Sequence, residues 1–173
     1  MDMVKFVLII FLLLGFLRQL SAQTRSVYTS LGEKNCKTLK SNPDEGGSYL
    51  GECRGTAGYK LQLLEGDLRQ SLNLLGPGGD KTELNLWNIS GGFSSLGENA
   101  EWRLKGKKPI ALIVRFNVSE NPENSSMITS YLVVIKLVKG SACITDAVKP
   151  TRSHNADARR AADASAGKPC RFR

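Results

Sequence analysis

The amino-acid sequence predicts a mainly β (α+β) domain: an antiparallel β-sheet or sandwich with one C-terminal α-helix, stapled by disulfides. Two apolar runs at strand spacing, 110–118 and 131–138, stand close together in the chain. An alanine-rich stretch near the C-terminus is the one good helix candidate, and four cysteines follow an export signal. No motif in the chain identifies an activity.

The two apolar runs form the centre of the predicted sheet. At period two, one face of the first run is wholly apolar and comprises Ile110, Leu112, Val114, Phe116 and Val118. The run over 131–138 is apolar on both faces, which is typical of a strand covered on both sides. Turn formers over 119–130 predict a long loop, so we expect the pair to be an antiparallel hairpin in the core.

The N-terminus has the layout of a secretory signal peptide. Lys5 precedes an apolar run over 6–17, and the small residue Ala22 ends the polar segment that follows. The run is shorter than the about 20 apolar residues of a membrane span, so we predict cleavage after Ala22, with an uncleaved anchor as the alternative. Residues 1–22 are then the signal peptide and residues 23–173 a single β-rich domain, and the protein is periplasmic or secreted.

Four cysteines, Cys36, Cys53, Cys143 and Cys170, are expected to form disulfides in an oxidising compartment. Of the three possible pairings, sequence proximity favours Cys36 with Cys53 and Cys143 with Cys170, and the other two stay open. No cysteine has a second cysteine or a histidine at zinc-finger spacing. We therefore expect neither a metal ion nor a cofactor.

The chain before the central pair predicts a β-meander. Its expected elements are a short strand or arm (26–31), a loop (37–49), a hairpin of two strands (59–63 and 69–74), a third strand (83–89), a loop or short strand (93–96) and a strand that carries Trp102 (100–104). In the hairpin, Leu72 and Leu74 are expected to face inward. The alternating Ser71 and Asn73 are expected to face solvent.

Beyond the central pair, the sequence predicts a short strand over 142–148 and then the helix. Asn155 is the expected N-cap, and Gly167 and Pro169 are expected to stop the helix. Its small-residue face, which lets it approach a sheet closely, comprises Ala158, Ala161, Ala162 and Ser165. Arg159 and Asp163 stand at i,i+4 and are expected on the exposed side.

Several catalytic chemistries find little support in the sequence. The only histidine is His154, ahead of the helix, and no Gly-x-Ser-x-Gly nucleophile elbow is present. The remaining enzyme hypothesis is a carboxylate-based hydrolase, which would use Glu98 and Glu101 with Arg103, or Asp67 with Arg69, in a cleft. We expect a protein without enzymatic activity and keep the hydrolase as the alternative.

The preferred hypothesis is an exported binding module, in the form of an inhibitor or an envelope-interaction protein, that acts on an unknown protein as a monomer. Trp102 and Arg103 are the expected binding residues. A second alternative is a basic face that binds anionic envelope polymer or lipid and makes peripheral membrane contact, with Lys105, Lys107 and Lys108 at its centre. Nucleic acid is not expected, because no aromatic residues alternate with these lysines.

Several segments of the sequence together resemble those of known proteins. The residues concerned are Ala100-Glu101-Trp102-Arg103, Ala111-Leu112-Ile113-Val114-Arg115, Leu132-Val133-Val134-Ile135-Lys136-Leu137, Cys143, and the stretch from Asn155-Ala156-Asp157-Ala158-Arg159 to Cys170. Together they resemble small exported bacterial proteins of unassigned function, over roughly residues 48–172. The resemblance implies bacterial export and transfers no catalytic residue.

Overall fold

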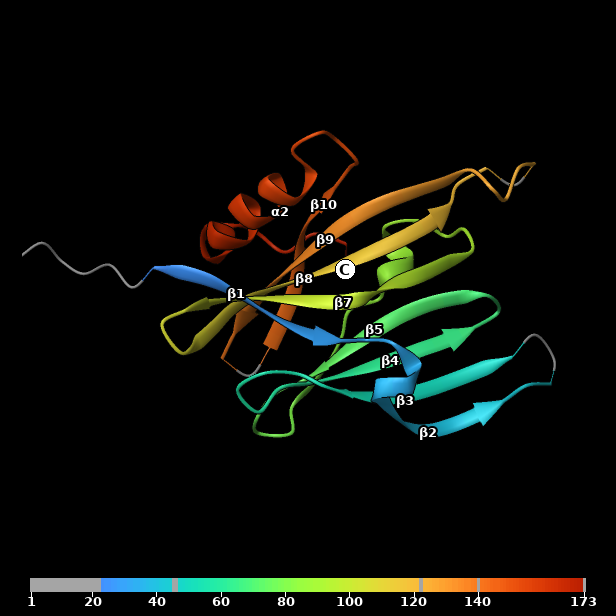
Figure 1. The fold of residues 1–173 in the computed structure, drawn as a ribbon, viewed down its shortest axis with the longest axis horizontal. Coiled ribbons are helices and arrows are strands. Elements are labelled where there is room, and N and C mark those ends of the chain that lie inside the picture. The colour runs from blue at the N-terminus through green and yellow to red at the C-terminus, as the bar shows by residue number, and fades with distance from the viewer. Residues whose placement is uncertain (1–22, 45–46, 122, 140, 173) are drawn as a thin grey trace, which may run out of the picture.

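A computed structural model describes residues 23–44, 47–121, 123–139 and 141–172, so the predicted signal peptide over 1–22 lies outside the described residues. Of the described residues, 55% lie in strands and 13% in helices, with an antiparallel-dominated sheet, two disulfides and one C-terminal α-helix (Figure 1). The predicted fold class is therefore confirmed. Within the described ranges, no helix is long and apolar enough to cross a membrane.

The strands are β1 (Thr24–Ser30), β2 (Cys36–Asn42), β3 (Ser48–Arg54), β4 (Lys60–Gly66), β5 (Arg69–Leu75), β6 (Lys81–Glu83), β7 (Ser94–Lys105), β8 (Lys108–Ser119), β9 (Ile128–Val138) and β10 (Ser141–Val148). The helices are α2 (His154–Asp163) and three short 3-10 turns, η1 (Glu33–Asn35), η2 (Leu86–Asn88) and η3 (Ser165–Gly167).

The sheet runs in the order β10-β9-β8-β7-β5-β4-β3-β2 and divides at β7. Strand β8 pairs with both halves of β7, across a register shift between Leu96 and Ala100. On the other side, β5 meets β7 only at the pair Arg69 and Ser94, while β1 pairs with the second half of β7. These two neighbours therefore leave the middle of β7 without a paired strand on this side, and we call this place the gap beside β7.

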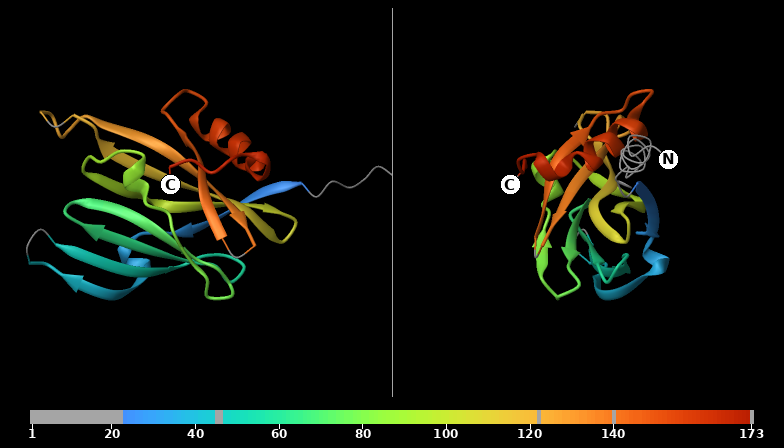
Figure 2. Two further views of the ribbon diagram at one scale, coloured as in Figure 1. Left: turned by 180° about the vertical axis from the view of Figure 1, so that it is seen from behind. Right: turned by 90° about the vertical axis from the view of Figure 1, so that its left-hand side faces the viewer.

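The sheet folds over on itself, so that β2–β5 lie across the core from β8–β10 (Figure 2). Leucines of β4 and β5, such as Leu61 and Leu72, belong to one buried cluster with Val114 of β8 and Ile135 of β9. Helix α2 covers the outer face of β8 and β9, as Figure 1 shows. The domain therefore has three layers: the two halves of the sheet and the helix.

The central pair is confirmed as the antiparallel hairpin of β8 and β9, in which Val114 is opposite Val133. Both faces of this hairpin are buried because each has its own cover. Val114 and its period-two neighbours face the other half of the sheet, whereas Ile113 and Val134 pack against the helix. The helix contributes Ala158 there, and such a small side chain lets the two backbones approach closely.

Both preferred disulfides are present. Cys36 and Cys53 are bonded at 2.00 Å, and Cys143 and Cys170 at 2.05 Å. The loop predicted over 37–49 is wrong, because this segment forms most of the β2–β3 hairpin, in which Cys36 and Cys53 are direct partners. Strand β2 is an exposed edge, so it lacks the alternating apolar residues that announce a strand.

Two further strand predictions need correction. The third strand expected over 83–89 is wrong: β6 ends at Glu83 and η2 follows, because Asn85 adopts a left-handed conformation (φ 44°) that no strand accommodates. Of the predicted segment 93–96, residues 94–96 belong with 100–104 to one strand, β7, which the register shift near Gly97 interrupts, and Phe93 lies just before it. A side chain at Gly97 would meet Arg115, with the added Cβ 2.8 Å from the arginine Cβ.

Two polar residues of β5 expected to face solvent, Ser71 and Asn73, are each only 5% exposed. The Ser71 Oγ accepts a hydrogen bond from the Leu86 backbone N–H at 3.1 Å. Strand β5 therefore has a cover on its second face, which η2 supplies. The inward orientation of Leu72 and Leu74 is confirmed.

The helix lies where the sequence placed it, with two corrections. Its N-cap is Ser153 and not Asn155, and the Ser153 Oγ donates a hydrogen bond to Asp157 at 2.6 Å. Arg159 and Asp163 do not form an exposed pair, because both reach back to β7. These two side chains join the helix to the sheet.

Candidate functional site

The expected binding residues Trp102 and Arg103 are both buried. The Trp102 side chain is 0% exposed, donates a hydrogen bond from Nε1 to Thr29 Oγ1 at 2.8 Å, and packs against Tyr59. Arg103 is 7% exposed and donates to the Asp163 carboxylate through Nε at 2.8 Å and Nη2 at 2.7 Å. In this conformation neither residue has a surface to offer a ligand.

The remaining donors of Arg103 bind the first strand. Nη1 donates to Ser26 Oγ at 2.6 Å, and Nη2 donates to Thr24 Oγ1 at 3.0 Å. The hydrogen bond to Asp163 is the main reason that the pKa of the Arg103 guanidinium lies above its usual value. The same contact holds the pKa of Asp163 below its usual range. Arg103 therefore ties β1, β7 and α2 together.

Glu101 also takes part in the contacts among β1, β7 and α2, and its carboxylate is already hydrogen-bonded. Its carboxylate accepts hydrogen bonds from Arg159 Nε at 2.6 Å and from Ser26 Oγ. Burial alone would raise the pKa of Glu101, but these hydrogen bonds and the Arg159 charge outweigh it and lower the pKa. The carboxylate therefore stays ionised, and it holds α2 against the sheet through Arg159.

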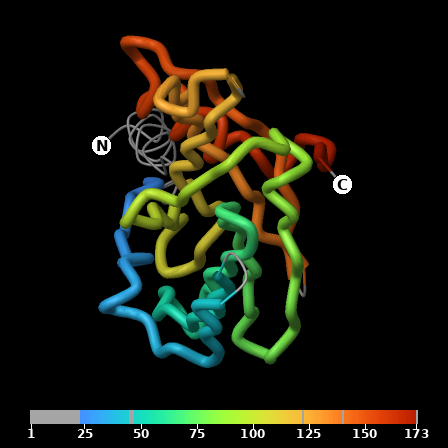
Figure 3. The backbone as a smooth tube through the Cα atoms, turned by 90° about the vertical axis from the view of Figure 1, so that its right-hand side faces the viewer, coloured from blue at the N-terminus to red at the C-terminus, as the bar shows by residue number. Residues whose placement is uncertain are grey.

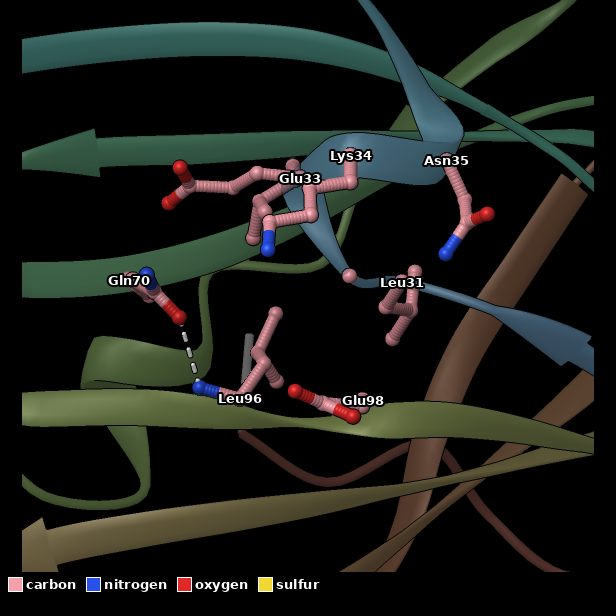
Figure 4. Close-up of a pocket in the computed structure, with 9 residues that line it drawn as sticks. Leu31, Glu33, Lys34, Asn35, Gln70, Leu96 and Glu98 are labelled. Atoms are coloured by element: carbon pink, nitrogen blue, oxygen red, sulfur yellow. Dashed lines mark hydrogen bonds between the residues drawn. The ribbon is translucent and has the colours of Figure 1, made fainter.

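Glu98, the intended partner of Glu101 in the hydrolase hypothesis, lines a cavity of about 440 Å³ at the gap beside β7 (Figure 4). Leu31, Leu63 and Leu96 supply apolar lining, and Gln70 bridges the gap by accepting a hydrogen bond from the Leu96 backbone N–H at 2.7 Å. Glu101 is not among its lining residues and pairs with α2. The structure does not bring the two carboxylates together.

The other hydrolase candidates are also apart from a catalytic arrangement. Asp67 is 76% exposed and pairs with Arg69 at 3.2 Å in the β4–β5 turn. His154 contacts the Val148 carbonyl oxygen through Nε2 at 2.8 Å. Among the described residues, no three His, Cys, Asp or Glu side chains lie close enough together to hold a metal ion.

The basic turn is exposed, as its sequence suggests. Lys105, Lys107 and Lys108 are all exposed around Gly106, which has a positive φ of 62° and lets the chain reverse between β7 and β8. This turn and the start of β1 lie at the left of Figure 1. Three cations at one hairpin tip can attract an anionic surface. None of the three lysines lines a cavity in the described part of the chain.

At the opposite end of the molecule, three loops converge. They are the β4–β5 turn, the connection from η2 to β7, and the β8–β9 loop (Figures 1 and 3). A large apolar side chain lies in solvent at each of them: Leu68 is 57% exposed, Phe93 48%, and Ile128, the first residue of β9 after the third loop, 54%. We call this surface the loop end and define it as Leu68, Arg69, Phe93, Ser119, Ser125 and Ile128.

Two grooves, of about 290 and 230 Å³, meet at the loop end. Both are lined by Phe93, Ser119 and Ser125, so Phe93 stands between them. Leu68 and Ile128 line the smaller groove, and Arg69 lines the larger one. The loop end therefore combines half-exposed apolar groups with hydroxyls and one cation.

Backbone hydrogen bonds hold the three loops against one another. The Ser94 N–H donates to the Leu68 carbonyl at 3.0 Å, and the Ser119 N–H donates to the Phe93 carbonyl at 2.9 Å. Gly92 makes this approach possible, because a Cβ there would lie 2.1 Å from the Ser119 carbonyl oxygen. The arrangement is pre-organised and does not need a partner to assemble it.

Leu68 has an unusual backbone conformation. It has a φ of 57°, in the left-handed region that a leucine rarely occupies, and its side chain is directed into solvent. Asp67 also has a positive φ, of 52°, so Asp67 and Leu68 form the two central residues of a tight hairpin turn between the paired Gly66 and Arg69, where Gly and Asn are the usual residues.

The loop-end residues were not among the predicted binding residues, because the segments that carry them have the composition of turns. Phe93 stands between Gly91-Gly92 and Ser94-Ser95, and Leu68 follows Glu65-Gly66-Asp67. A large apolar residue within a turn-forming segment was the available signal.

Comparison with family models, curated proteins and solved structures finds no match to this chain.

Proposed function

We propose that this chain is an exported, non-enzymatic binding protein that recognises a protein partner through the loop end. The observation that carries the proposal is the convergence of Leu68, Phe93 and Ile128, each about half exposed, around two grooves. Large exposed apolar groups that gather at one place are typical of interaction sites, whereas scattered ones are ordinary.

The chemistry of the loop end favours a protein partner. Its apolar groups alternate with serine, asparagine and glycine, a composition that antibody paratopes share because short polar side chains adapt their hydrogen bonds to the partner. Burying the exposed half of each apolar side chain contributes on the order of 1 kcal/mol. The loops are held by backbone hydrogen bonds, so less ordering entropy is lost on binding.

Export is supported by the covalent framework. Two disulfides, Cys36–Cys53 and Cys143–Cys170, suit the periplasm or the extracellular space, where thiols are oxidised. The binding hypothesis is favoured over the hydrolase because Glu101 and Arg103 are saturated by structural contacts, and Glu98 faces a different part of the surface.

Affinity capture tests the proposal. The mature chain, residues 23–173, is immobilised and exposed to an extract of the envelope and of the medium, and retained proteins are identified by mass spectrometry. A Leu68→Ser/Phe93→Ser variant should lose the specific partner. Leu39→Ser is the matched control, because Leu39 is also exposed, at 44%, but lies on edge strand β2. Equal capture by all three proteins, or no capture above background, would overturn the proposal.

A second candidate function is binding of anionic polymer or lipid by the basic turn, and the exposure of Lys105, Lys107 and Lys108 favours it. Vesicles that contain phosphatidylglycerol provide the test. Replacement of all three lysines by glutamate should reduce co-sedimentation with these vesicles at low salt, since each lysine near such a surface contributes about 1 kcal/mol. Unchanged co-sedimentation would remove this candidate.

A further inference from the structure

The end of the molecule opposite the loop end carries more cations than the β7–β8 turn alone. Strand β1 pairs with the end of β7 and places Arg25 beside this turn. Strand β9 pairs with β8 so that Lys136 is opposite Ala111, and the β9–β10 turn with Lys139 therefore reaches the same end (Figures 1 and 2). We call this surface the basic end and define it as Arg25, Lys105, Lys107, Lys108, Val138 and Lys139.

The charge of the basic end is not neutralised by its neighbours. All five cations are exposed, and none forms an ion pair with a residue in the described ranges. Two further lysines near this end, Lys60 and Lys81, are paired with Glu52 and Glu83 and add no net charge. The β3–β4 and β5–β6 turns also reach this end, and of their residues only Asp80 is acidic. The basic end therefore keeps most of its positive charge.

The loop end has the opposite balance of charge. Its turns carry three exposed acidic residues, Asp67, Glu120 and Glu123. The cations close to them are Arg69, which pairs with Asp67, and Lys149, whose charge acts on Glu120. An anionic surface therefore attracts one end of the molecule and not the other, so it orients the molecule as well as binding it.

The shape of the basic end favours a lipid surface over a polymer chain. None of its five cations lines a cavity formed by the described residues. The cavity that Val138 lines measures about 30 Å³, which is the volume of one water molecule, so this end has no groove for a chain. Val138 is itself 43% exposed next to Lys139. An apolar side chain among cations can enter the boundary between lipid headgroups and acyl chains.

We infer that the basic end docks on an anionic lipid bilayer and that the domain stands end-on, with the loop end directed away from the lipid. The cations contact the headgroups, and Val138 enters the boundary beneath them. The inference rests on the second candidate function and deepens it, because it names the bilayer as the anionic partner and fixes the orientation. In this orientation the bilayer leaves Phe93 and its neighbours accessible to a protein partner.

Cations outside the β7–β8 turn provide the first test. Co-sedimentation at low salt measures partitioning of the mature protein onto vesicles of phosphatidylglycerol and phosphatidylcholine. Arg25→Gln/Lys139→Gln should weaken partitioning roughly 20-fold, since each cation near such a surface contributes about fivefold. Lys40→Gln/Arg152→Gln is the matched control, because it removes two exposed cations outside the basic end, and it should stay within about twofold of the wild type. Thermal unfolding establishes that each variant is folded.

Paramagnetic broadening measures the orientation. The same vesicles are prepared with a small share of a lipid that carries a gadolinium chelate, and amide signals of the ¹⁵N-labelled mature protein are recorded. Amides 106–108 and 139 should broaden more than amides 92–94 of the loop end. Salt at about 1 M, where the screening length is about 3 Å, should remove the broadening at both ends.

Equal broadening at the two ends, or a loss of partitioning no larger than that of the control variant, would overturn the inference. Polyglutamate that binds as tightly as the vesicles, at the same concentration of negative charge, would overturn the choice of lipid. The second candidate function fails separately: if the three-lysine variant loses vesicle binding while Arg25→Gln/Lys139→Gln does not, the basic turn binds lipid and the end-on orientation is wrong. If the wild type binds no vesicles, both fail, and capture of a partner by the loop end is unaffected.

Discussion

Arg103 of β7 and Asp163 of α2 form a two-point contact in which guanidinium Nε and Nη2 donate to the two carboxylate oxygens at 2.8 and 2.7 Å. The residues are 60 positions apart in sequence, and the Asp163 carboxylate also accepts a hydrogen bond from Thr24 of β1 at 2.9 Å. One contact therefore joins the first strand, the longest strand pair and the helix. It also explains why the helix can dock although its buried face is mostly alanine.

Loss of the Asp163 charge should destabilise the domain. Asp163→Asn should lower the free energy of unfolding by about 2–3 kcal/mol, because it removes the carboxylate that the buried Arg103 guanidinium binds at two points and leaves only the more distant Glu101, at 3.9 Å, as a counter-ion. Equilibrium urea unfolding of the mature protein measures the effect. Asp44→Asn, at an exposed position in the β2–β3 turn, is the control and should lie within about 0.5 kcal/mol of the wild type. Equal stability of the two variants would contradict a structural role for the pair.

Acid should weaken the contacts that Glu101 and Asp163 make between the sheet and α2. The pKa values of Glu101 and Asp163 are both lowered in the folded state, so their stabilisation is fully present above the unfolded pKa values, about 4. It is lost as the pH falls through the folded values. The urea midpoint of the wild type should therefore decrease between pH 5 and pH 3. A Glu101→Gln/Asp163→Asn variant should show a smaller decrease, and an identical one would exclude these carboxylates as its cause.

Two adjacent glycines offer a sharp test of the loop end. Gly92→Ala should cost about 1–3 kcal/mol or displace the β8–β9 loop, because its Cβ would lie 2.1 Å from the Ser119 carbonyl oxygen. At Gly91 an added Cβ meets nothing within 4 Å, so Gly91→Ala should be nearly neutral. Thermal unfolding and amide shifts around Phe93 measure both variants. A neutral Gly92→Ala would mean that the two loops are not in contact in solution.

The disulfides should act on different parts of the fold. Serine replacement of either pair should cost about 3 kcal/mol, since the bonds close loops of 17 and 27 residues. Loss of Cys143–Cys170 should also release the tail from β10, where the Arg171 N–H donates to the Ile144 carbonyl at 2.7 Å. Hydrogen exchange at Arg171 should then accelerate in this variant and not in the Cys36–Cys53 variant. Protection unchanged in both would separate the tail contact from the disulfide.

The strands with the strongest sequence signal were predictable, and those without one were not. The β8–β9 hairpin carries continuous apolar runs, so its position follows from the sequence. Strand β2 lies at an edge with almost no buried residue, and its sequence is therefore that of a loop. The buried Ser71 and Asn73 were mistaken for solvent-facing residues because separate segments surround them: η2 binds Ser71, and Asn73 pairs with Glu83 of β6.

The candidate site was harder to predict than the fold. Trp102 and Arg103 stand out in the sequence because their side chains are large and versatile, yet the structure uses them to join elements. Leu68 and Phe93 stand in turn-forming segments whose position relative to each other depends on the sheet topology. A sequence pattern of period two cannot state which hairpin tips share one end of the molecule.

The sequence by itself determined the β-rich class, the central hairpin, the C-terminal helix and the cysteines available for disulfides, because period, propensity and covalent chemistry are local properties. Only the tertiary structure decided that β5 pairs with β7 at a single residue pair and that β1 pairs with the second half of β7. It also decided that three distant loops meet at Phe93. Such relationships arise from contacts between segments far apart in the chain, and local patterns carry no information about them.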